Sequence, residues 1–203
     1  YLRKTFAAKK SITKARLYAT ALGVYEASIN GQRVSDDLLA PGWTDYTKRV
    51  MVQTYDVTQL IHTGANAVGA VLGDGWFAGR LGWMGLAQYG TPTPAFSAQL
   101  EITYADGTRD VIASDDSWKG GAGEIVGSDE QWGEVDNAQN SVKNWNQPNF
   151  DASTWKNVIA EEHSVALVPQ LGPPLPELMD LAPKKITRLG DTWIVDVDQN
   201  LVG

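Results

Sequence analysis

The sequence has no cysteine among its 203 residues. Disulfides, thiolate zinc sites, thiol nucleophiles and iron–sulfur clusters are therefore excluded. No apolar run approaches the ~20 residues that a membrane-spanning helix needs. The beginning, Tyr1 to Phe6, has neither an initiator Met nor the apolar core of a signal peptide. We expect no membrane partner and a piece of a longer chain, either exported or cytoplasmic.

Positive charge is also scarce, with 17 Lys and Arg against 24 Asp and Glu and a net charge of −7. Six of the bases lie in the first 25 residues, which contain no acid, so the chain from Glu26 onward is strongly acidic. Such a surface repels phosphate backbones and anionic lipid. Neutral or cationic ligands are expected, and nucleic acid is not.

Helical periodicity is rare, since no stretch of a dozen residues sustains a 3.6-residue period. Only short helical turns are predicted, over 56–61 and 151–155, each opened by an aspartate that can cap free N–H groups. Alternating apolar and polar residues instead predict a half-buried strand over 96–104. A turn at 105–108 and a returning strand over 109–113 complete a hairpin.

A second hairpin joins strands predicted over 24–29 and 32–34 through Asn30-Gly31, a pair typical of type I′ turns. Together these short strands predict an all-β antiparallel sandwich or jelly roll. The proline-rich stretch beginning at Pro169 predicts a boundary. We expect one domain over 1–168, then a connector and the truncated opening strands of a following β-sandwich over 169–203. Further strands are predicted over 15–21, 50–55, 67–72, around Trp118 and over 193–197.

Two patterns suggest enzymatic chemistry. Residues 73–78 match the G-x-G-x-x-A dinucleotide motif, but the glycines that follow at 79, 82 and 85 predict a loop rather than the required helix. Glu134 and Asp136, two positions apart on a strand, would share one face about 6–7 Å apart, and could serve as the acid and base of a small glycosidase. Solvated surface acids are the favoured alternative for this pair.

Five aromatic residues lie in glycine-rich loops rather than at alternating strand positions. Flat rings in loops can stack on the apolar faces of sugars. They can equally close the ends of the sandwich or cover a neighbouring domain, and both interpretations stay open. These sugar-binding candidates are Trp43, Trp76, Phe77, Trp83 and Tyr89.

Asp36 and Asp37 lie in a predicted turn over 35–38, with Asp45 nearby. Carboxylates are the hard oxygen ligands that Ca²⁺ prefers, although the spacing is not that of an EF-hand loop. The turn is thus either a Ca²⁺ site completed by backbone carbonyls or a plain acidic turn, with the plain turn favoured.

A family resemblance is carried by the stretches 15–26, 29–34, 39–46, 53–58, 72–79, 104–108, 133–138, 145–155 and 196–203. In this order along the chain, they resemble the N-terminal β-sandwich region of bacterial α-L-rhamnosidases, the inverting enzymes of glycoside hydrolase family 78. The resemblance implies a galactose-binding-like sandwich ahead of an (α/α)₆ catalytic barrel that these residues do not include. This chain would therefore be an inert accessory domain of an enzyme that removes terminal α-L-rhamnose.

The resemblance extends to calcium-dependent rhamnose-binding modules. It implies Asp36 and Asp37 as Ca²⁺ ligands, with a backbone contribution from the loop over 89–92. The implied partners are an L-rhamnose-containing glycan or glycoside and, by intramolecular packing, the catalytic barrel. The alternatives are a ligand-free scaffold and, more remotely, a self-contained glycosidase using Glu134 and Asp136.

Overall fold

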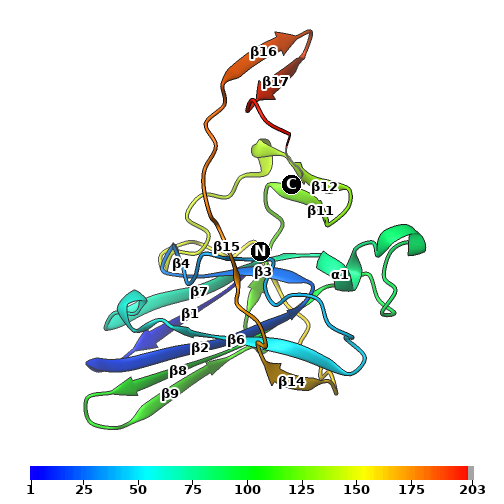
Figure 1. The fold of residues 1–203 in the computed structure, drawn as a ribbon. Helices are drawn as coiled ribbons and strands as arrows, with labels where there is room; N and C mark the ends of the chain where they lie inside the picture. Colours follow the sequence, from blue (N-terminus) through cyan, green and yellow to red (C-terminus); the bar gives the residue numbers. More distant parts are fainter. Residues whose placement is uncertain (201–203) are drawn as a thin grey trace.

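The computed structural model describes residues 1–200, which fold into two packed sheets and two projecting hairpins (Figure 1). Every pair of neighbouring strands in the two large sheets is antiparallel except β14 and β6. The predicted antiparallel β-sandwich is confirmed. One sheet has the order β13 (Lys156–Asn157), β10 (Lys119–Gly120), β1 (Leu2–Ala8), β7 (Gly64–Gly73), β3 (Val24–Ile29) and β4 (Gln32–Arg33), and the other has β14 (Ala166–Pro169), β6 (Arg49–Asp56), β2 (Ile12–Leu22), β8 (Ala95–Tyr104) and β9 (Arg109–Ala113).

The core lies between the inward faces of the two sheets. In β8 the alternation seen in the sequence places Leu100 and Ile102 in the core, where each is at most 1% exposed. Leu100 is opposite Leu17 of β2 in the strand register, and Ile29 and Val68 fill the core from the other sheet. The period of two thus decides which side chains are buried, and burial stabilises each by about 1.5–3 kcal/mol.

The turns follow local chemistry in most places. Asn30 and Gly31 have φ angles of 51° and 84°, as a type I′ turn requires. The 3₁₀ helix η1 (Thr58–Leu60) lies within the first predicted helical turn. The second helical prediction was wrong: residues 151–155 form a turn, in which the Asp151 carboxylate accepts the backbone N–H of Ser153 at 2.9 Å. The aspartate completes a local turn there and does not cap a helix.

Helices are short in the described residues. The α-helix α1 (Gly75–Ala78) directly follows β7 and is a single turn long, so the predicted interruption by glycines agrees with the structure. None of the helices in residues 1–200 is long and apolar enough to cross a membrane. The remaining helical turns are η2 (Gly82–Met84) and η3 (Ala138–Asn140).

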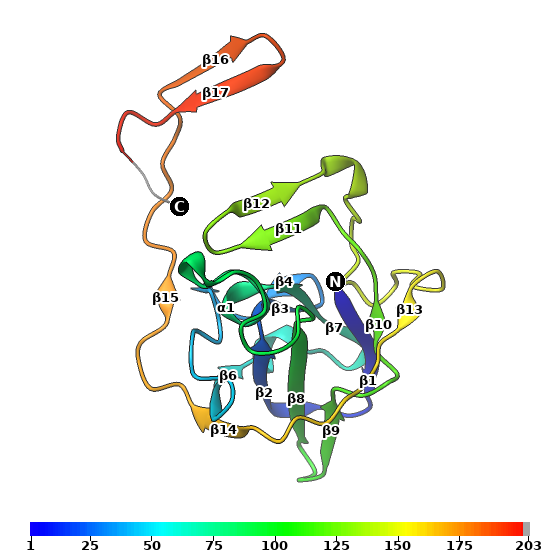
Figure 2. The same cartoon turned by 90° about the vertical axis from the view of Figure 1, so that its right-hand side faces the viewer.

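Two hairpins stand outside the sandwich. The first is β11 (Ile125–Asp129) with β12 (Gly133–Asp136), and the second is β16 (Lys185–Leu189) with β17 (Thr192–Asp196). Figure 2 shows both above the same side of the sandwich, and so does Figure 1, from which it is turned by 90°. The second hairpin agrees with the further β structure expected after Pro169.

The proline-rich connector runs along the sandwich before it leaves. β14 extends the five-stranded sheet by pairing in parallel with β6. Farther on, β15 (Leu175–Pro176) pairs with β5 (Asp37–Leu38). The turn predicted over 35–38, called the acidic turn below, is therefore wrong in its second half, which is a strand because the connector pairs with it. The first part of the connector therefore contacts the domain that precedes it, and the boundary at residue 169 stays a prediction.

Candidate functional site

Four of the five predicted sugar-binding aromatics lie together. The rings of Trp43 and Trp76 are stacked at 6.4 Å with an interplanar angle of 8°, and those of Phe77 and Tyr89 at 6.2 Å with 7°. The indole N–H of Trp43 donates to the Tyr89 hydroxyl at 3.0 Å. Tyr46, absent from the sequence prediction, packs edge-on against Phe77 and Tyr89 at 5.3 and 4.9 Å. These five residues are called the loop cluster below.

The loop cluster is built where α1 packs against the start of β3. A Cβ atom added to Gly75 would lie 2.8 Å from Val24 and 2.9 Å from Gly23, so only glycine permits this approach. Gly75 also has a φ angle of +51°. The close contact turns Phe77 inward, where it is 5% exposed, and leaves Trp76 half-buried.

The loop cluster has a buried side and an open side. Tyr46 is 5% exposed, and burial together with the neighbouring Tyr89 and Glu130 raises the pKa of its hydroxyl. Trp43 is 55% exposed. The arrangement therefore presents the stacked Trp43–Trp76 pair to solvent on a packed base of Tyr46 and Phe77. A flat indole face held in this way suits contact with the apolar face of a sugar.

Trp83 does not join the loop cluster. It lies in η2 and is 99% exposed, without any of the ring contacts found among the aromatics of residues 1–200. The nearest organised contacts belong to its neighbours: the guanidinium of Arg80 lies 4.1 Å above the ring of Trp132 and pairs with Asp129 at 3.3 Å. Trp83 was grouped with the other four aromatics because it is near them in the sequence. In the fold its ring makes no contact with theirs.

The acidic turn lies at the other end of the loop that carries Trp43. Asp36 is exposed and Asp37 is half-buried, and the backbone N–H of Asp37 donates to the Ser35 hydroxyl at 3.1 Å. None of the ion pairs within residues 1–200 involves either carboxylate. Neither negative charge is thus neutralised by an ion pair in this part of the chain.

Asp37 faces a small cavity of about 170 Å³ whose lining includes the loop residues 37–42 and the connector residues 172–175. Beside it a polar chain crosses the core: Tyr25 donates to the Gln53 side chain at 2.9 Å, and its hydroxyl lies 3.1 Å from that of Tyr55. Burial, and then the negative charge of Asp37, raise the pKa of Tyr55 to about 12. The negative charge of Asp37 thus acts on the hydroxyl at the end of this polar chain.

The connector brings further negative charge to the acidic turn. The pKa of Glu177 is raised, chiefly by the hydrogen bond and charge of Asp180, with a smaller contribution from Asp36. Within residues 1–200, however, no three His, Asp or Glu side chains converge as metal ligands. Ca²⁺ takes six to eight oxygens, so the carboxylates fit its chemistry in kind but leave most positions to carbonyls, water or sugar hydroxyls.

Glu134 and Asp136 lie on β12, on the projecting hairpin. Both are exposed, and neither lines the cavities described here. The strand spacing places them on one face, as the sequence predicts. An acid–base pair for glycoside hydrolysis needs a cleft that holds the scissile bond between the carboxyls. This surface of β12 does not provide one.

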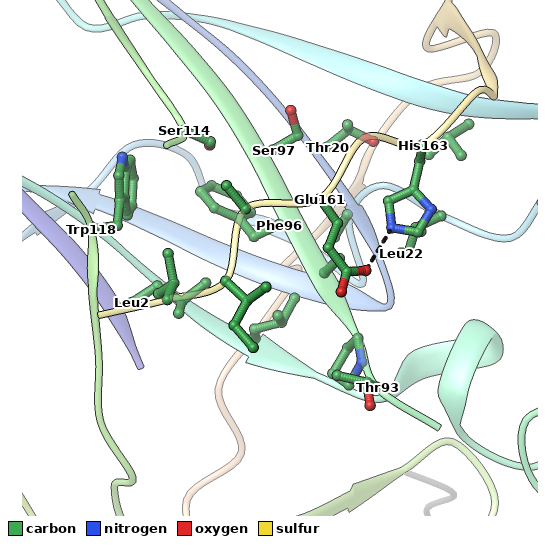
Figure 3. A pocket seen from close by; sticks show the side chains of 18 of the residues that line it. Leu2, Thr20, Leu22, Thr93, Phe96, Ser97, Ser114, Trp118, Glu161 and His163 are labelled. Atoms are coloured by element: carbon green, nitrogen blue, oxygen red, sulfur yellow. Dashed lines mark ion pairs between the residues drawn. The ribbon is translucent and has the colours of Figure 1, made fainter. Parts of the chain in front are cut away.

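A larger cavity of about 730 Å³, which no sequence pattern indicated, opens beneath the segment 158–167 (Figure 3). Phe96 and Trp118 face it, and the pair Glu161–His163, 4.0 Å apart, lies at its side. Two polar groups on its wall are already partnered: Thr20 donates to the Met51 carbonyl at 2.6 Å and the Trp118 indole N–H to the Ala113 carbonyl at 3.0 Å. The lining is mixed, because apolar side chains alternate with polar ones such as Ser97 and Glu161.

The family model described as the α-L-rhamnosidase N-terminal domain matches residues 10–177. An α-L-rhamnosidase of Streptomyces avermitilis is 45% identical over 197 residues, covering 96% of this chain and 19% of the relative. One from Formosa agariphila is 40% identical over 206 residues, covering all of this chain and 22% of the relative. This chain thus spans about a fifth of the length of these relatives.

Solved structures agree. The crystal structure of the Streptomyces avermitilis α-L-rhamnosidase complexed with L-rhamnose superposes with a TM-score of 0.91 at 43% identity, covering 98% of this chain and 20% of that one. The α-L-rhamnosidase from Dictyoglumus thermophilum gives a TM-score of 0.85 at 37% identity, with 98% and 22% covered. Sequence identity and fold similarity therefore point to the same group of relatives, the α-L-rhamnosidases.

Proposed function

This chain belongs to the α-L-rhamnosidase N-terminal domain family, and from that premise we propose that it is a non-catalytic accessory domain that binds terminal L-rhamnose through Ca²⁺. The bound sugar would belong to the glycan or glycoside on which the complete enzyme acts. Hydrolysis of terminal α-L-rhamnose would take place outside these residues.

The observation that supports the proposal is that one segment, over 35–46, carries two carboxylates near one end and an exposed indole near the other. Its first end holds two carboxylates without ion-pair partners in residues 1–200. Its second end holds Trp43, stacked on Trp76 and hydrogen-bonded to Tyr89. Gly42, which lines the same cavity as Asp37, directly precedes Trp43.

The chemistry of the two ends is complementary. Ca²⁺ held by Asp36 and Asp37 would supply a hard cation whose remaining positions vicinal hydroxyls can fill in place of water. Rhamnose also carries an apolar 6-methyl group, for which the open indole face of Trp43 offers contact area. The acidic residues of the connector strengthen the local negative potential that retains the ion.

Isothermal titration with L-rhamnose, in millimolar Ca²⁺ and again after EDTA, tests this proposal. We expect binding only with Ca²⁺, and its loss when Asp36→Ala and Asp37→Ala are combined. Asp116→Ala is the matched control, since it removes an exposed acid elsewhere on the sandwich. Equal heats with and without Ca²⁺, or unchanged Ca²⁺ affinity of the double variant, would refute the assignment.

A further inference from the structure

We propose that an exposed aromatic surface, separate from the loop cluster, is the docking face for another part of the same polypeptide. This docking face consists of Trp83, Met84, Leu86 and Trp132. The proposal rests on the proposed function in one respect: its occupant is the remainder of the α-L-rhamnosidase. It does not require this chain to bind rhamnose.

The docking face is held in place by polar contacts beneath it. The Asp129 carboxylate accepts the backbone N–H of Arg80 at 3.0 Å and pairs with its guanidinium at 3.3 Å. That guanidinium lies 4.1 Å above the Trp132 ring. With its amide oriented to satisfy both atoms, Gln131 donates to the Gly82 carbonyl at 2.9 Å and accepts the Gly82 N–H at 2.8 Å.

These contacts join two segments that are about fifty residues apart in the chain. The loop 80–86 and the tip of the β11–β12 hairpin therefore present their apolar side chains as one preorganised surface. Two further N–H groups, from Gln131 and Trp132, bind the same Asp129 carboxylate at 2.9 and 3.1 Å. The hairpin tip is thus fixed locally as well as tied to the loop.

The side chains on this surface are strongly exposed. Trp83 is 99% exposed, Trp132 76%, Met84 63% and Leu86 50%. Tryptophan and methionine are enriched at protein interfaces and are costly to leave in water as a group. The polar contacts of Asp129, Arg80 and Gln131 fix the backbone of this surface but do not bury its rings. A surface that holds large apolar side chains toward solvent in this way is typical of a binding face.

The charge around the docking face indicates the chemistry of its occupant. The hairpin residues 125–136 contain four acids and no base, and the loop residues 79–90 contain one base, Arg80, which is already paired with Asp129. A complementary partner has an apolar centre and a basic rim. The same acidity disfavours a second copy of this surface, which would bring like charges together.

The length of the related enzymes supports the rest of the polypeptide as the occupant. This chain spans 19% and 22% of two curated α-L-rhamnosidases, so about four fifths of such a polypeptide lies outside it. In both views the connector leads to the β16–β17 hairpin on the same side of the sandwich as β11–β12 (Figures 1 and 2). Covalent attachment on that side gives the rest of the polypeptide a high effective concentration near the docking face.

Hydroxyl-radical footprinting of the complete polypeptide and of the 203-residue chain tests the proposal. We expect Trp83, Met84 and Trp132 to react about tenfold more slowly in the complete polypeptide, as burial in an interface requires. Ile159 is 84% exposed. It belongs to the segment between β13 and β14, which runs along the end of the sandwich away from the two hairpins (Figure 2). Its rate is the internal control and should be the same in both proteins.

A variant supplies a second readout. Trp83→Ser combined with Trp132→Ser should leave the melting temperature of the 203-residue chain unchanged and lower that of the complete polypeptide. Ile159→Ser, the matched control, should change neither. A fall in both proteins would show that the rings support the sandwich itself, and no change in either would show that nothing covers them.

Three footprinting results would overturn the proposal. Equal rates in the two proteins would mean that the face stays open. Protection of the 203-residue chain that grows with its concentration would mean that a second copy binds there. Protection by L-rhamnose would make the face a sugar site. A failed Ca²⁺ titration, by contrast, would refute the proposed function and leave the docking face unaffected.

Discussion

The loop cluster and the docking face are built from the same kinds of residue in neighbouring loops, yet they differ in what supports the rings. In the loop cluster each ring contacts another ring, and Tyr46 and Phe77 are each 5% exposed. In the docking face Trp83 has no ring contact within residues 1–200, and the Trp132 ring lies under the guanidinium of Arg80. Ring-on-ring packing makes the first a piece of core with one open side, whereas the second depends on polar contacts and on what covers it.

Phe77→Ala should produce the largest effect, because it removes a buried ring that both Tyr46 and Tyr89 contact. Truncating a buried phenylalanine costs about 3–5 kcal/mol of unfolding free energy. Urea unfolding measures the loss, with Trp83→Ala as the exposed-aromatic control. If both variants unfolded at the same urea concentration, the contrast between the two regions would be wrong.

Asp129→Asn should produce the next largest effect, in the polar support of the docking face. Burial alone would raise the pKa of Asp129, but hydrogen bonds from Gln131, Arg80 and Trp132 and the charge of Arg80 outweigh it, so the pKa lies below 3.8. Losing hydrogen bonds to a charged group costs about 2 kcal/mol. Urea unfolding measures this cost. An unchanged unfolding midpoint would contradict the stabilising role given to Asp129.

The lowered pKa of Asp129 also makes the stability of the loop 80–86 depend on pH. A carboxylate with a depressed folded pKa stabilises above its unfolded pKa of 3.8 and loses that contribution as the pH falls through the folded pKa. Amide exchange over 80–86, corrected for its intrinsic rate, should therefore quicken on acidification below about pH 4. In Asp129→Asn this acid dependence should be absent.

Tyr89→Phe should have a smaller effect, because it keeps the ring and removes only the hydroxyl that accepts the Trp43 indole N–H. The expected cost is about 1 kcal/mol of unfolding free energy. Tryptophan fluorescence should also report a more mobile Trp43. Tyr18→Phe is the control, since the Tyr18 hydroxyl has no hydrogen bond within residues 1–200. Equal behaviour of the two variants would deny that the bond orients Trp43.

Trp83→Ser should have the smallest effect on the 203-residue chain. Its side chain is 99% exposed, and substitutions at such positions usually change stability by less than about 0.5 kcal/mol. Thermal unfolding of the chain checks this prediction. A destabilisation as large as that of Phe77→Ala would place Trp83 in the core and merge the two regions.

Much of the sandwich could be predicted, because its signals are local. The alternation over 96–104 and the Asn30-Gly31 turn depend on neighbouring residues only, and the structure contains both as expected. The strand β1 was not predicted, although it pairs with β7 over seven positions. Its first residues include Arg3 and Lys4 and show no clear alternation, so its place is fixed by pairing rather than by its own pattern.

The candidate site was predictable in its members but not in its grouping. Glycine-rich loops dense in aromatics indicated a site, and four of the five rings named from the sequence meet in the structure. Tyr46 was missed because it lies in a loop without periodicity, where nothing in the sequence shows that its ring turns inward. Trp83 was included in the predicted site because it is near Trp76 and Phe77 in the sequence. Nearness in the sequence does not show that two side chains are near in space.

By itself, the sequence determined the class of fold, the acidic surface, the absence of thiol chemistry and the loops in which a site would form. These follow from composition, a period of two and turn chemistry, each of which acts within a few residues. Only the tertiary structure decided that Phe77 is core while Trp83 faces solvent, and that Asp129 holds Arg80 from 49 positions away. Burial and partnership depend on segments that are distant in the chain, and the folded sandwich alone brings those segments together.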